Sequence, residues 1–245
     1  MGHTVQHDGF DDDGCDAICH QTSAPIATSL KHFKPIPKII NGHKSNSNLL
    51  RYQVFLKILS ETNEIITCGG VLISNLWILT AAHCIYGARQ AEIILGANNR
   101  NNRYERTQQH FFVKNSNFIV HANYPRLYYD IGLIKLPIQI SFTEAIQPIR
   151  IPCFNEVNNN YIGRKALISG WGMTSDGIHG TSSCSGDSGG PLVLLDNNGQ
   201  IEKLIGLVSF GFIGQCTKDK PQGYLKISSY LQWIRQNTNG QLKMC

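Results

Sequence analysis

The sequence Gly186-Asp187-Ser188-Gly189-Gly190-Pro191 places a serine in a turn built largely from glycine. Glycine lets the backbone bend sharply and come close to a bound molecule. A serine presented in this way can act as a nucleophile, while neighbouring backbone N–H groups stabilise the negative charge that develops on a carbonyl oxygen. Glycine-rich turns around a serine also occur without any such chemistry, so the rest of the chain has to decide between the two interpretations.

Two further segments supply partners for this serine. Thr80-Ala81-Ala82-His83-Cys84 lies upstream, and Asp130-Ile131-Gly132-Leu133-Ile134-Lys135-Leu136 lies between the other two segments. A serine hydroxyl needs a base, and a histidine side chain, which titrates near neutral pH, can take and return its proton. An aspartate can fix the tautomer of that histidine. Alone, His83 would suggest a core histidine beside a disulfide and Asp130 a turn cap, but together, in this order, the three favour a catalytic set.

With these three segments the chain resembles the chymotrypsin/trypsin family of serine proteases, from about Ile39 to about Asn239. The resemblance implies an all-β fold of two antiparallel six-stranded β-barrels with a C-terminal helix. It also implies hydrolysis of peptide bonds through an acyl-enzyme at Ser188, with His83 as the base and Asp130 as its orienting partner. The N–H groups of Gly186 and Ser188 would then form the oxyanion hole.

The distribution of polar and apolar residues along the sequence agrees with this architecture. Residues 1–38 are polar and irregular and suggest a pro-segment, whereas residues 39–245 form the expected protease domain, with the first barrel over about 39–140 and the second over about 141–245. Short alternating apolar runs separated by turn residues predict strands, and 228–237 predicts a helix capped by Ser228 or Ser229, with Tyr230, Leu231 and Ile234 on one face. The predicted strands are 52–59, 70–74, 76–79, 91–95, 111–113, 118–120, 131–136, 165–169, 191–195, 203–209 and 223–227.

The family pattern breaks after Gly170-Trp171-Gly172, because only ten positions lead from Gly172 to Ser182. The resemblance implies roughly 35 residues more, enough for two strands, a short helix and their loops. We therefore expect a truncated second barrel. Two functions stay open: a serine endopeptidase, and a catalytically inactive homologue that acts as a binding or regulatory protein.

Eight cysteines indicate disulfides and an oxidising compartment, hence secretion. Residues 1–31 lack the apolar stretch of a signal peptide, so we expect a native N-terminus other than Met1. The resemblance implies disulfides Cys68–Cys84 and Cys184–Cys216, while Ala166 and Leu194 stand where many members hold another bridge. The pairing of the remaining four stays open, including a bridge that tethers residues 1–38 through Cys153; the four are Cys15, Cys19, Cys153 and Cys245.

The segment Lys38-Ile39-Ile40-Asn41-Gly42 resembles the family's activation site. Cleavage after Lys38 would free the Ile39 ammonium to pair with Asp187 and organise the oxyanion hole.

Specificity follows from the residues that match the family's primary pocket. Ser182 falls at its base, where a serine removes the carboxylate that would select Arg or Lys. A neutral P1 residue, as for chymotrypsin or elastase, is therefore expected. The other expected substrate-binding residues are Ser209, Phe210, Gly211 and Gln222.

Charge and hydropathy exclude several other classes of partner. The net charge of +5 comes from scattered Lys and Arg, which argues against nucleic acid, and no run of 18 apolar residues predicts a membrane span. The loop 98–106 holds a single carboxylate, Glu105, which argues against Ca²⁺. We expect no metal or cofactor, and a monomer whose partners are protein or peptide substrates, an activating protease and protein inhibitors.

Overall fold

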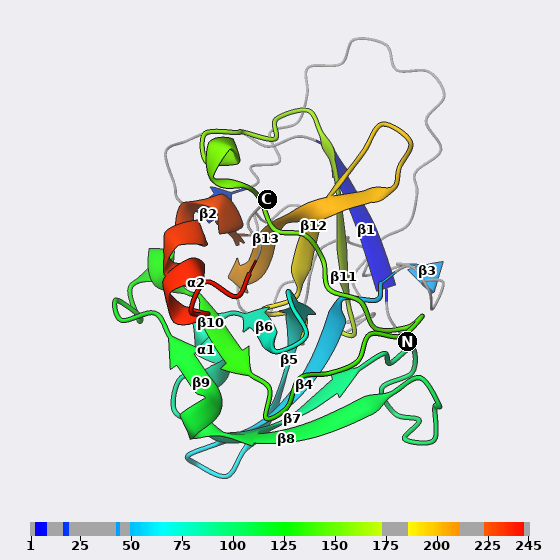
Figure 1. The fold of residues 1–245 in the computed structure, drawn as a ribbon, viewed down its shortest axis with the longest axis vertical. Helices are drawn as coiled ribbons and strands as arrows, with labels where there is room; N and C mark the ends of the chain where they lie inside the picture. Colours follow the sequence, from blue (N-terminus) through cyan, green and yellow to red (C-terminus); the bar gives the residue numbers. More distant parts are fainter. Residues whose placement is uncertain are drawn as a thin grey trace, which may run out of the picture.

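The structure, a computed structural model, describes residues 3–8, 17–19, 43–44, 50–172, 186–210 and 223–242. It has two seven-stranded antiparallel sheets, one below the other in Figure 1. The all-β class with a short C-terminal helix is confirmed. No helix in the described ranges has the length and apolar character needed to cross a bilayer.

The first sheet has the order β8-β7-β4-β5-β6-β10-β9. Its strands are β4 (Gln53–Ser60), β5 (Ile65–Leu72), β6 (Trp77–Thr80), β7 (Ala88–Leu95), β8 (Gln109–Lys114), β9 (Phe118–Val120) and β10 (Gly132–Lys135). Side chains alternate between the two faces of a strand, so Val54, Leu56 and Ile58 of β4 point into one core inside this sheet.

The second sheet has the order β2-β14-β13-β12-β11-β1-β3. Its strands are β1 (His3–Asp8), β2 (Ala17–Cys19), β3 (His43–Lys44), β11 (Lys165–Gly170), β12 (Pro191–Leu195), β13 (Ile201–Phe210) and β14 (Gly223–Lys226). Ala166 and Leu194, at the positions of the bridge found in other members, are register partners across β11 and β12. They lie in the core inside this sheet.

The two sheets are joined by a core that both of them build. In β6, Ile78 points into the first sheet's own core, whereas Trp77 and Leu79 face the second sheet. Val193 of β12 and Leu225 of β14 meet them from the other side. These strands carry apolar residues on both faces, and the packing of one of those faces fixes how the two sheets dock. The candidate site lies along this junction.

The C-terminal segment packs against the shared core. It begins as a 3₁₀ turn, η4 (Ile227–Tyr230), and continues as α2 (Leu231–Asn237). Tyr230, Leu231 and Ile234 are buried on one face, as the sequence predicts. The predicted serine cap is wrong, since the α-helix starts after Tyr230 without a side-chain cap. The remaining helical segments are α1 (Ala82–Ile85), η1 (Asn115–Asn117), η2 (Leu127–Tyr129) and η3 (Phe154–Glu156).

The N-terminal region differs from the expected irregular tail. Residues 3–8 and 17–19 form β1 and β2, and both belong to the second sheet. His43 and Lys44, expected in the first barrel, pair with β1 instead. Each sheet thus has seven strands rather than six, and three of the second sheet's strands precede residue 45. Sequence periodicity did not indicate them because β1 is largely polar and β2 and β3 are only three and two residues long.

Candidate active site

His83 and Asp130 meet through two hydrogen bonds. His83 lies on the one-turn helix α1, and Asp130 follows η2 directly before β10. The backbone N–H of His83 donates to Asp130 Oδ1 at 2.8 Å, and His83 Nδ1 lies 2.8 Å from Oδ2. Asp130 is buried, while the His83 side chain remains 34% exposed. One edge of the imidazole is therefore held by a carboxylate and the ring stays accessible.

Ser209 is a third donor to the same carboxylate. Its hydroxyl donates to Asp130 Oδ2 at 2.6 Å, from the end of β13 in the second sheet. A carboxylate that accepts three bonds is held in one orientation. An ionised carboxylate only accepts, so the hydrogen-bond network assigns the proton of His83 to Nδ1 and leaves Nε2 as the acceptor. Sequence reasoning placed Ser209 in substrate binding and missed this contact, which only the docking of the two sheets creates.

The Ser188 turn is anchored by its backbone. The carbonyl of Ser188 accepts from the N–H of Gly69 at 2.7 Å, and the N–H of Gly189 donates to Val208 at 2.7 Å. Gly189 has φ +75°, and a Cβ there would lie 2.3 Å from Thr80 Oγ1, so only glycine fits. The turn is thus held against β5 and β6 of the first sheet and β13 of the second.

The described bonds leave two N–H groups of this turn unused. Among the residues that the structure describes, neither Gly186 nor Ser188 donates its backbone N–H to another group. Gly186 has φ +98°, a backbone conformation that favours glycine. Two free donors beside a serine can bind a negatively charged oxygen.

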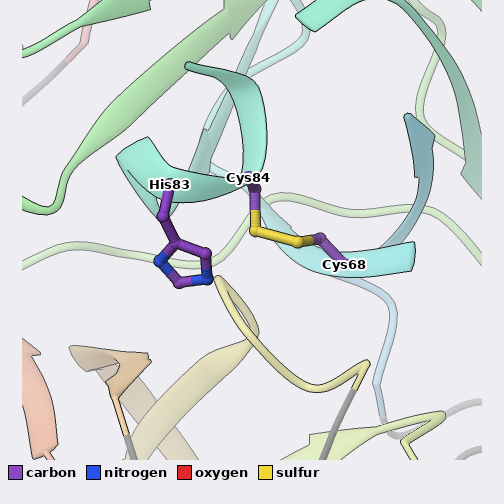
Figure 2. A group of neighbouring side chains, drawn as sticks. All are labelled: Cys68, His83 and Cys84. Carbon is purple, nitrogen blue, oxygen red and sulfur yellow. A yellow bond between two sulfur atoms is a disulfide. The ribbon is translucent and has the colours of Figure 1, made fainter. Parts of the chain in front are cut away.

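The Ser188 turn and His83 are neighbours through Cys84. The Cys84 sulfur lies 3.6 Å from the Ser188 carbonyl oxygen, and the His83 ring leaves the same helix as Cys84 (Figure 2). Within the described ranges, no hydrogen bond joins the Ser188 hydroxyl to the His83 ring. Such bonds are often long before substrate binds, so the arrangement is compatible with proton transfer between them.

Asp187 is buried beside the tryptophan landmark. Its Oδ1 accepts from the N–H of Gly172 at 2.8 Å. A Cβ on Gly170 would lie 2.1 Å from Oδ1, and one on Gly172 would lie 2.3 Å from Oδ2. The two glycines that flank Trp171 therefore make room for this carboxylate.

Cys68 and Cys84 form a disulfide with an S–S distance of 1.98 Å. It joins β5 to α1 beside His83, as Figure 2 shows. Although His83 and these two sulfurs lie within 4.8 Å of one another, both sulfurs are spent on the disulfide and offer no thiolate to a metal. Cys153 is also disulfide-bonded.

Several predicted residues lie outside the described part of the chain: Lys38, Ile39, Ser182, Cys184, Gly211, Cys216 and Gln222. Cys15 and Cys245 lie there too, and Cys19 is described only through the backbone of β2. Phe210 is described, and its ring covers Gly223, where a Cβ would lie 2.1 Å from it.

The Glu105 carboxylate is engaged within its own loop. Its Oε2 accepts from the N–H groups of Asn98 and Asn99, both at 3.0 Å, and from the Gln108 amide at 2.7 Å. The carboxylate shapes this loop through those bonds.

Comparison with known proteins places this geometry in context. The family model described as Trypsin matches residues 39–178 and 173–234. Collagenase of Hypoderma lineatum is 35% identical over 238 positions, with 82% of this chain and 87% of the relative covered. Chymotrypsin of Phaedon cochleariae is 32% identical, with 83% of each chain covered. A solved structure of HL collagenase matches with a TM-score of 0.68 and 34% identity, over 81% of this chain and 98% of that chain.

The same comparisons bear on the shortened second half of the chain. The family model matches in two pieces that overlap at 173–178. The Hypoderma lineatum alignment runs over 238 positions, whereas 82% of 245 residues is about 201, so about 37 aligned positions have no residue in this chain. Both findings agree with the shortfall expected between Gly172 and Ser182.

Proposed function

Because this chain belongs to the trypsin family of serine proteases, a family of serine endopeptidases, we propose that it cleaves peptide bonds through an acyl-enzyme at Ser188. The observation that carries the proposal is the pair of bonds between His83 and Asp130, with the Ser188 turn held beside them. That pair supplies a base whose free ring nitrogen is the acceptor.

The reaction proceeds in two halves. Nε2 of His83 takes the Ser188 proton as the hydroxyl attacks the scissile carbonyl, and returns it to the leaving amine. Asp130 stabilises the imidazolium, and the N–H groups of Gly186 and Ser188 bind the oxyanion. Water then attacks the acyl-enzyme by the same route and releases the second product. The 2.6 Å bond from Ser209 keeps the carboxylate in place throughout.

We extend the proposal to regulation and specificity. Cleavage after Lys38 frees the Ile39 ammonium to pair with Asp187, whose buried carboxylate already lies behind the Ser188 turn. Ser182 at the base of the primary pocket favours a neutral P1 residue. The protein acts outside the cell as a monomer, on protein substrates, under control of an activating protease and of protein inhibitors.

Labelling with a fluorophosphonate, which reacts with an activated serine, tests the mechanism. We expect the purified chain to be labelled at Ser188, at a rate that rises after cleavage at Lys38–Ile39. Ser188→Ala should abolish labelling and His83→Ala should reduce it by about 1,000-fold. A folded, cleaved protein that is never labelled would make this chain a catalytically inactive homologue with a binding or regulatory role, for which the deletion at 173–178 offers a reason.

A further inference from the structure

Two of the three N-terminal strands, β1 and β2, flank the four strands that the rest of the chain gives to the second sheet. Within residues 50–242, the second sheet consists of β14-β13-β12-β11, so β11 and β14 are its edges. β1 pairs antiparallel with β11 over six residue pairs, from His3–Gly170 to Asp8–Lys165. β2 pairs antiparallel with β14 over three, from Gly223–Cys19 to Leu225–Ala17. Figure 1 shows β1, in blue, beside β11.

Without these partners the four-stranded sheet would present two rows of unpaired N–H and C=O groups. An open edge is a template for any extended chain, including another copy of the protein. The register with β11 covers the full length of that strand, Lys165–Gly170. β1 therefore pairs with every residue of β11, and no part of that edge is left without a neighbouring strand.

The length of the missing segment matches the two strands that pair with β11 and β14. The alignment with collagenase of Hypoderma lineatum leaves about 37 positions without a residue in this chain, and the two pieces of the family match change over at 173–178, between β11 and β12. A segment of that length holds two strands and their connections. β1 and β2 lie at the two edges of the four-stranded sheet, and β3 pairs with the other side of β1.

We propose that residues 3–8 and 17–19 are a built-in replacement for the missing strands, completing the second sheet by strand addition at β11 and β14. This is the mode by which extended peptides bind exposed sheet edges, with main-chain hydrogen bonds supplying the affinity. If the chain is cleaved after Lys38, as proposed above, the N-terminal segment then stays on the sheet as a second chain instead of leaving as a released propeptide.

Hydrogen exchange of the full-length chain, read by mass spectrometry, tests this proposal independently of turnover. Proline at a paired position removes a ladder donor, so Val5→Pro with Ile18→Pro should detach both strands. We expect exchange in 165–170 and 223–226 to rise at least about tenfold, with β7 of the first sheet unchanged. The control, Val5→Ala with Ile18→Ala, keeps every backbone donor and should behave as the parent chain does. Equal protection of 165–170 in the proline variant and the parent would overturn the proposal.

A cross-link covers the case in which the proline variant does not fold. Asp8 and Lys165 are register partners, and Lys165 is exposed, so Asp8→Cys with Lys165→Cys should form a disulfide in the otherwise unchanged chain. The matched control is Asp8→Cys with Lys114→Cys, on the outer strand β8 of the other sheet. A disulfide in the first pair but not in the second supports the proposal. A disulfide in neither pair, or equally in both, contradicts it. Peptide mapping separates these links from those of the native cysteines.

Discussion

The Asp187 carboxylate accepts a 2.8 Å hydrogen bond from the N–H of Gly172, and no side chain larger than hydrogen fits at that glycine. The contact ties the turn that carries Ser188 to the last described residue after β11, directly before the deletion. The geometry of the serine turn therefore depends on a segment that the chain has shortened.

Gly172→Ala tests this dependence. A Cβ 2.3 Å from Asp187 Oδ2 forces the buried carboxylate to move, so we expect a loss of about 1–3 kcal/mol in the free energy of unfolding. Labelling of Ser188 should slow as well, because the turn shifts with Asp187. Urea unfolding and labelling rates measure the two effects. Gly199→Asn, at a turn with open space around the added atoms, serves as control and should change neither.

Ser209→Ala probes the third donor to Asp130. Loss of a bond to a charged acceptor costs about 2 kcal/mol, so kcat/KM should fall by about tenfold to thirtyfold. Titration of reactive serine separates a slower reaction at each site from a loss of folded molecules, and we expect the number of reactive sites to stay unchanged. Ser228→Ala, at a buried serine that donates to Val157, is the matched control.

Asp187→Asn tests the proposed activation. An asparagine can still accept the Gly172 bond but cannot form an ion pair with the Ile39 ammonium. After cleavage at Lys38–Ile39, the parent chain should be labelled at least about tenfold faster, whereas the variant should gain nothing. Equal gains in both would remove Asp187 from the activation step.

Peptides that differ only at P1 test the pocket. We expect Phe or Leu to be preferred over Lys or Arg by on the order of 100-fold, because a buried charge without a partner costs several kcal/mol. Ser182→Asp adds a carboxylate and should shift preference toward Lys and Arg. A basic preference in the parent chain, measured as kcat/KM, contradicts the assignment of Ser182.

An ion pair remote from the site governs stability in acid. Lys203, 5% exposed, pairs with Glu156. Burial opposes the charged form of Glu156, but the Cys153 N–H and Lys203 outweigh it and lower the pKa of Glu156 below its usual value. Glu156→Gln should cost about 2 kcal/mol at pH 7, less than a fully isolated charge would cost because Glu202 remains near Lys203.

The sign of the pH effect follows from the direction of that shift. A lowered pKa means that the stabilisation is complete above the unfolded pKa, near 4.3 for a glutamate, and is lost as the pH falls through the lower folded pKa. Urea unfolding at pH 7 and pH 3 should therefore show a difference between parent and Glu156→Gln that shrinks in acid. An undiminished difference at pH 3 excludes the charge as its cause, and Glu202→Gln, at a more exposed carboxylate, should show a smaller effect throughout.

The sequence predicted most of the strands in residues 50–242, because their apolar residues alternate with period two. The continuous apolar run Trp77, Ile78 and Leu79 predicts strand β6, although it does not reveal that the two faces of this strand pack into different cores. The motif order predicted His83 and Asp130 as partners. The bond from Ser209 to Asp130 could not be predicted, since it crosses between sheets that only tertiary packing brings together.

Strands β1 and β2 were missed for a different physical reason. Sequence periodicity detects strands that bury side chains on one face, whereas His3–Asp8 is held by backbone pairing along an available edge. Such a strand forms because the edge of β11 offers unpaired backbone groups, and its own sequence carries little signal. The shortfall after Gly172 could be predicted from the sequence, but the strands that pair with the shortened sheet, β1 and β2, could not, because they lie far upstream in the chain.

The core shared by the two sheets has a consequence for how the protein can be assayed. Asp130 reaches His83 in one half and Ser209 in the other only while Leu79 and Leu133 stay docked on Val193 and Leu207. A molecule whose halves have separated keeps its strands and disulfide but has lost the carboxylate's third donor. Stoichiometric titration of reactive serine therefore counts correctly docked molecules, and it should decline earlier in denaturant than far-ultraviolet circular dichroism does.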